Sequence, residues 1–189
     1  MVRFTIFVFT LLATVTFVGA RRRSEATRVY TINTYLNRTA AKLERRLKDR
    51  EVWLQQEYIN AHNSERVAHG ATPLTWDDEL SASAAAWANQ CKFKHSQTGQ
   101  NLAAGTGDPT PATAVGWWND ERADYDPANP KYSHWTQVVW KSTERLGCAM
   151  ASCAPGTVLP TEDGDASYLV CHYDPAGNVI GQFDQNVQK

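Results

Sequence analysis

Four cysteines, Cys91, Cys148, Cys153 and Cys171, are the residues of this sequence whose chemistry is easiest to interpret. Thiols either pair as disulfides or bind a metal ion as thiolates, and an even number suits complete pairing. Structural zinc sites often use C-x-x-C pairs, which these cysteines do not form. We therefore expect two disulfides and an oxidising compartment, with three pairings still open.

The start of the chain points to the same compartment. Arg3 precedes an apolar run at residues 4–18, and the small residues Gly19 and Ala20 close it. The run is shorter than the ~20 residues that a membrane-spanning helix needs. We predict that residues 1–20 form a cleavable secretory signal peptide rather than a membrane anchor, and that the mature protein is soluble and extracellular.

Charge divides the remaining sequence into two regions. Residues 21–50 hold ten Lys and Arg against three Asp and Glu, whereas residues 51–189 hold eight against seventeen. The acidic region argues against nucleic-acid binding, which depends on cationic contacts to phosphate. Its length is typical of one domain. We predict a basic, helical N-terminal extension at 21–50, followed by a single domain at 51–189.

The extension has the features of an exposed helix. Asn37 begins the only N-glycosylation sequon of the chain, and we predict that it is glycosylated. Neither Pro nor Gly occurs from Ser24 to His69. Apolar residues recur at helical spacing at Leu36, Ala40, Leu43, Leu47, Leu54 and Tyr58. We expect a helix that lies on the main domain, although such a basic segment could also contact an anionic membrane surface transiently.

In the main region, helical patterns precede strand-like ones. Helices are expected at residues 55–69, 76–91 and 112–122, and strands at 136–140, 145–152, 167–173 and 178–183. Glycines and prolines mark residues 99–111 as a loop. Because no βαβ repetition is present, the order of these elements predicts an α+β fold with an antiparallel sheet.

Two segments of this region resemble the signatures of the CAP superfamily, which includes cysteine-rich secretory proteins, antigen 5 and pathogenesis-related class 1 proteins. They are residues 134–143 (HWTQVVWKST) and 168–179 (YLVCHYDPAGNV). The likeness covers residues 51–183 and is greatest to plant and fungal members. It implies an α-β-α sandwich with a short antiparallel sheet between helices. It also implies the disulfides Cys91–Cys153 and Cys148–Cys171.

The resemblance further implies a polar cleft, in which the matching residues are His95, His134 and Glu121. The family's other acid is replaced here by Gln100. Two histidines and a carboxylate could hold a zinc ion, while a glutamine cannot act as a proton acceptor at physiological pH. A satisfied polar network is the alternative. We therefore expect binding rather than catalysis, with a metal-dependent hydrolase as the alternative.

The resemblance also suggests a lipid ligand. Fungal sterol-exporting members carry their sterol loop where this chain has Tyr125, Pro127, Pro130, Tyr132 and Trp135. A second lipid site of the superfamily lies between helices, where the small residues of 82–88 could leave room for a fatty acid. We predict a secreted, monomeric, non-enzymatic protein that binds a sterol or fatty acid and acts in defence or at a host–microbe interface. A further alternative is a precursor that releases residues 175–189 as a signalling peptide.

Overall fold

The computed structural model describes residues 22–189, so the expected signal peptide at residues 1–20 lies outside the described part of the chain. The chain divides into two compact units. One comprises Leu54–Lys189, and the other contains the part of the first helix that precedes Leu54.

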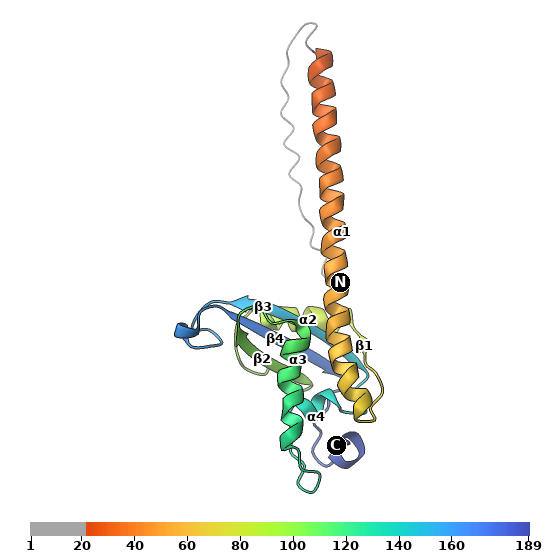
Figure 1. Cartoon of the computed structure of the whole chain (residues 1–189), viewed down its shortest axis with the longest axis vertical. Coiled ribbons are helices and arrows are strands. Elements are labelled where there is room, and N and C mark those ends of the chain that lie inside the picture. The colour runs from red at the N-terminus through yellow and green to blue at the C-terminus, as the bar shows by residue number, and fades with distance from the viewer. Residues whose placement is uncertain (1–21) are drawn as a thin grey trace. The chain divides into compact units, whose positions relative to one another are not determined.

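The elements follow one another along the chain in the order shown in Figure 1. The helices are α1 (Arg22–Ala68), α2 (Asp78–Ala88), α3 (Pro111–Asn119), α4 (His134–Val138) and α5 (Phe183–Asn186). The strands are β1 (Thr75–Trp76), β2 (Gln100–Thr106), β3 (Arg145–Cys153) and β4 (Ala166–Asp174). Two 3₁₀ helices, η1 (Asp120–Asp124) and η2 (Thr161–Asp163), complete the order.

The four strands form one sheet in the order β1-β3-β4-β2. Strand β4 pairs antiparallel with both β3 and β2, while the two residues of β1 pair parallel with β3. Alternate residues of β4 face opposite sides of the sheet, because side chains alternate along a strand. Tyr168 and Val170 belong to one core, and Leu169 and Cys171 to the other.

Each face of the sheet is covered by helices, as expected for the α-β-α sandwich. Helix α2 packs on β3 and β4, and its residues Ala84 and Ala88 are fully buried there. The opposite core takes Tyr58 from α1, Val115 from α3 and Val138 from α4. The α+β class expected from the sequence is therefore confirmed.

Both disulfides have the expected pairing. Cys148 and Cys171 face each other across β3 and β4, and their bond lies inside one core. Cys91, which follows α2, is joined to Cys153 at the end of β3. The second bond ties the end of the α2 segment to the sheet that α2 covers.

Local sequence features explain where α1 ends and where α2 begins. Helix α1 runs without Pro or Gly until Gly70, whose φ of +67° is a conformation that glycine adopts without strain. Helix α2 begins at Asp77, whose carboxylate accepts hydrogen bonds from the backbone N–H groups of Glu79 and Leu80. The helix expected at 76–91 is thus present but shorter at both ends.

Within the other unit, the described side chains of residues 29–53 are exposed, apart from half-buried Thr34. The helix predicted for the extension is present, and Asn37 is exposed on it. Its contact with the main domain and its glycosylation stay predictions. None of the described helices combines the length and apolar composition that a membrane span requires.

Three secondary-structure predictions were wrong. Residues 136–140 lie mostly in helix α4 and the turn after it rather than in a strand. Residues 178–182 are irregular, with a turn at 180–181, and Phe183 begins α5. Residues 100–106, expected to be a loop, form β2. In each case, tertiary partners outweigh local preference, since β-propensity largely measures how well a side chain packs when buried.

Candidate functional site

A polar cleft of about 700 Å³ lies where the start of β2, η1 and the N-terminal end of α4 meet. Its lining brings together the four cleft residues expected from the sequence. They are His95, Gln100, Glu121 and His134.

Glu121 holds His134 and the start of α4 at the same time. One carboxylate oxygen, Oε1, lies 2.6 Å from His134 Nδ1, and the other accepts the backbone N–H groups of His134 and Trp135 at 2.7 and 3.3 Å. Because an ionised carboxylate only accepts hydrogen bonds, Nδ1 of His134 carries the proton. In the neutral form of that ring, the lone pair is therefore on Nε2.

Gln100 organises the opposite side of the cleft. The backbone N–H of Ser96 donates to Gln100 Oε1 at 3.0 Å, and this donor fixes which end of the amide is oxygen. His95 Nδ1 lies 3.1 Å from the same oxygen, so it must donate, and the lone pair of the neutral ring is on Nε2. Both histidines of the cleft are thus held in the tautomer whose Nε2 can bind a cation.

The other end of the Gln100 amide meets a buried histidine. Gln100 Nε2 donates to His172 Nε2 at 2.8 Å, so the proton of His172 sits on Nδ1. That atom is buried and has no hydrogen-bond partner among the described residues. Burial lowers the pKa of His172 to about 4, so its ring is neutral at physiological pH. The sequence offered no signal for this contact, which arises because Gln100 and His172 face each other across β2 and β4.

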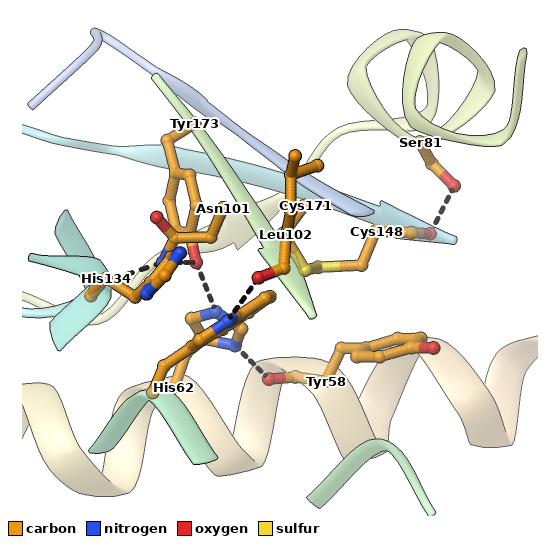
Figure 2. The surroundings of a disulfide bond; sticks show 10 residues. Tyr58, His62, Ser81, Asn101, Leu102, His134, Cys148, Cys171 and Tyr173 are labelled. Atoms are coloured by element: carbon orange, nitrogen blue, oxygen red, sulfur yellow. Dashed lines mark hydrogen bonds between the residues drawn. A yellow bond between two sulfur atoms is a disulfide. The ribbon is translucent and has the colours of Figure 1, made fainter. Parts of the chain in front are cut away.

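Below the cleft, a second chain of hydrogen bonds runs into the core beside the Cys148–Cys171 disulfide (Figure 2). Asn101 Nδ2 donates to the carbonyl of His134 at 2.9 Å and to the hydroxyl of Tyr173 at 3.2 Å. That hydroxyl lies 2.9 Å from His62 Nε2, and His62 Nδ1 donates to the carbonyl of Tyr58. This chain fixes the floor of the cleft.

A second hollow, of about 610 Å³, lies between the loop before α4 and the segment before α5. Tyr132 lies on one side with 73% of its surface exposed, and Ile180 lies on the other with 87% exposed. Phe183, which is buried, also lines the hollow. The charged groups at its edge are Lys131 and Asp184.

Comparison with known proteins identifies the family. Residues 59–173 match the CAP family, described as the Cysteine-rich secretory protein family. The chain belongs to the CAP family. Among curated relatives, it is 46% identical over 134 residues to fruiting body protein SC14 of Schizophyllum commune, a match that covers 66% of this chain and 62% of that protein. The chain therefore spans less than two thirds of the length of SC14.

A plant relative and a solved structure agree with this membership. The chain is 42% identical over 142 residues to pathogenesis-related protein 1B of Nicotiana tabacum, which covers 68% of this chain and 79% of that protein. The crystal structure of NaASP2 with Zn²⁺ is similar with a TM-score of 0.55 and 25% identity, covering 68% and 82% of the two chains. The resemblance to the CAP superfamily inferred from the sequence is thereby confirmed.

The residues expected to bind a metal ion in the CAP cleft differ in their hydrogen bonding. His95 and His134 offer free Nε2 atoms, but both oxygens of Glu121 already accept hydrogen bonds at the start of α4. Among the described residues, the only cluster with metal-ligand spacing is His62 with Cys148 and Cys171. Those cysteines are joined to each other and His62 is hydrogen-bonded at both nitrogens, so that cluster is structural.

The aromatic residues expected to form a lipid loop lie in two different environments. Tyr125 and Trp135 are buried in the core of the CAP domain, with ring centroids 5.2 Å apart. Tyr132 and Pro127 are exposed, and Pro130 is half-buried. Of the three rings, only Tyr132 is accessible to a ligand.

Sequence reasoning missed the residues that hold this loop and the C-terminal segment in place. Glu65 Oε1 accepts from Trp135 Nε1 and Arg122 Nη1, both at 2.8 Å. Asn178, with a φ of +58°, accepts from the Thr136 hydroxyl at 2.7 Å. These contacts join α1, η1, α4 and the C-terminal segment, and no local pattern in the sequence reveals them.

Proposed function

We propose that this CAP protein is a secreted, non-enzymatic lipid-binding protein, and that the lipid occupies the hollow between Tyr132 and Ile180. The observation that carries the proposal is the exposure of these two large apolar side chains on either side of that hollow, with Phe183 also in its wall. Exposed apolar surface costs free energy in water, and a ligand that covers it removes this cost.

The size and edge of the hollow suit a single lipid molecule. A volume of about 610 Å³ falls within the range of small-molecule pockets. The ammonium of Lys131 could pair with a fatty-acid carboxylate, while the carboxylate of Asp184 could accept the hydroxyl of a sterol. A sterol and a fatty acid therefore remain the two candidate ligands, and they would use different charged groups.

The proposal is tested by titrating the secreted protein with a labelled sterol and a labelled fatty acid. Tyr132→Asp and Ile180→Asp should each abolish saturable binding, because each places a charge against the apolar ligand. Val67→Asp is the matched control, since Val67 is an apolar residue, 63% exposed, on α1 and away from the hollow. Saturable binding that survives both hollow variants, or no saturable binding at all, would refute the proposal.

A divalent cation in the polar cleft is a second candidate function. It is supported by the two free Nε2 atoms of His95 and His134, and by the Zn²⁺ named in the NaASP2 structure. Calorimetric titration with zinc should show a site that is weakened by His95→Ala and by His134→Ala. Metal-dependent hydrolysis has less support, because Gln100 cannot act as a base.

The similarity to pathogenesis-related proteins supports a role in defence. The two disulfides support secretion, because disulfides form in oxidising compartments. Release of residues 175–189 as a signalling peptide has little support. Phe183 and Val187 are buried in the core, so release would expose apolar surface. Lys189 also donates to the carbonyl of Tyr125 at 2.6 Å, which ties the last residue to the domain.

A further inference from the structure

The part of α1 that precedes Leu54 carries exposed apolar residues whose role the proposed function does not explain. Val29, Leu36 and Leu43 are seven residues apart, and each is more than half exposed. A second series offset by four residues places Asn33, Ala40 and Leu47 beside them. Together the two series form the a and d positions of a heptad repeat, in which the apolar seam of one helix meets the seam of another.

From Leu36 to Leu47 the large exposed apolar side chains all lie in this seam, which favours a partner helix over a membrane surface. Nearer the start of the helix, Tyr30 and Ile32 flank the seam at positions e and g, and Tyr35 lies at position c. A helix that lies on a membrane or on a protein core presents a broad apolar face, whereas a coiled coil needs only the a and d positions. Here Arg38 and Arg45 lie on the side of the helix opposite the seam, and the exposed Val52 also lies away from it. Most of the stability of a helix in a protein comes from packing its apolar face, so a helix of this kind needs a partner.

The polar residues in and beside the seam specify which partner fits. Asn33 occupies an a position, where two asparagines from parallel, in-register helices meet and hydrogen-bond. Arg46 at position g lies opposite Glu51 at position e of a parallel second copy, so the pair forms twice by symmetry. An antiparallel pairing would lose both interactions. Arg50, at the next d position, ends the seam because two arginines would meet there.

We propose that the seam formed by Val29, Asn33, Leu36, Ala40, Leu43 and Leu47 pairs with the same seam of a second copy of this chain in a parallel, two-stranded coiled coil. This departs from the monomer expected from the sequence, and it would give an assembly with two lipid hollows. Asn37, the expected glycan site, lies outside the a and d positions.

The test is sedimentation velocity on the secreted chain, with intact mass used to verify that the extension is present. The wild-type protein should sediment as a dimer that dissociates on dilution. Leu36→Glu/Leu43→Glu should be monomeric, while Val52→Glu should remain dimeric. Val52 is a matched control because it is apolar and 56% exposed, as Leu36 is.

Charge reversal tests the orientation. Arg46→Glu should weaken the dimer by placing two acidic side chains opposite each other, and Arg46→Glu/Glu51→Arg should restore it. A protein that is monomeric at every concentration would overturn the proposal. An oligomer that Leu36→Glu/Leu43→Glu does not dissociate would also overturn it. If the wild-type protein is monomeric and binds anionic phospholipid vesicles, and Leu36→Glu/Leu43→Glu loses that binding, the seam contacts a membrane instead.

Discussion

A single backbone N–H group decides the chemistry of one side of the polar cleft. Because Ser96 N–H must donate, Gln100 Oε1 must face it, and the protons of His95 and His172 follow from that orientation. The consequence is a buried Nδ1–H on His172 that has no partner among the described residues. The glutamine therefore determines hydrogen-bond roles and not only charge.

Gln100→Glu should change the tautomer of His172. A carboxylate at this position accepts at both oxygens, so His172 must donate from Nε2 and give up the proton on Nδ1. The negative charge should also raise the pKa of His172, because it stabilises the imidazolium. Nitrogen-15 NMR of the imidazole rings measures both effects.

His62 is the internal control for that experiment, since its partners Tyr58 and Tyr173 do not change. If His172 kept its Nδ1 proton in Gln100→Glu, the amide orientation would not be what sets its tautomer.

At the scale of elements, α4 shows how tertiary contacts can specify a helix of five residues. Its sequence is β-branched and aromatic, yet Ser133 and Thr136 form a capping box at its start. The carboxylate of Glu121 meets its first N–H groups, and the buried guanidinium of Arg66 donates to the carbonyls of Val138 and Trp140 at its end. An anion at the N-terminus and a cation at the C-terminus both stabilise a helix.

Contact between α2 and β3 depends on a residue without a side chain. A Cβ at Gly147 would lie 2.1 Å from the backbone nitrogen of Ser81 and 2.5 Å from the carbonyl carbon of Leu80. The small residues of 82–88 therefore serve close packing of α2 on the sheet. The two hollows described above are lined by elements other than α2.

Gly147→Ala should lower the free energy of unfolding by about 1–3 kcal/mol or more, because α2 must move away from β3. Denaturant unfolding measures the loss. Gly116→Ala is the control: a Cβ there meets nothing within 4 Å, and alanine is favoured over glycine inside a helix, so stability should rise by about 0.5–1 kcal/mol. An unchanged midpoint for Gly147→Ala would show that α2 adjusts without cost.

For the whole molecule, two buried histidines make stability depend on pH. Burial lowers the pKa of His62 and of His172 to about 4, from 6.5. Between pH 6.5 and 4, these histidines are protonated in the unfolded chain but stay neutral in the folded chain. Their contribution to the free energy of unfolding is therefore complete above pH 6.5 and is lost as the pH falls toward 4. Each histidine should contribute a slope of about 1.4 kcal/mol per pH unit in that window.

Urea unfolding at a series of pH values measures this dependence. His172→Asn removes one of the two groups and should roughly halve the slope, while leaving His62 in place. Equal stability at neutral pH and at pH 5 would contradict the prediction.

Features that depend on neighbours along the chain could be predicted from the sequence. The absence of Pro and Gly up to His69 and the order of helices before strands are local features, and local spacing reports them. The α+β class followed from that order. The family signatures then supplied the pairing of the cysteines, which spacing alone left open among three choices.

Features that join distant residues emerge only when the chain is folded. Three features of the site depend on segments far apart in the sequence. They are the contact of Gln100 with His172, the burial of Tyr125 and Trp135 in the core, and the hollow between Tyr132 and Ile180. Hydrogen bonding and burial depend on what surrounds a side chain in space. The fold brings those surroundings together, and one sequence read along its length does not show them.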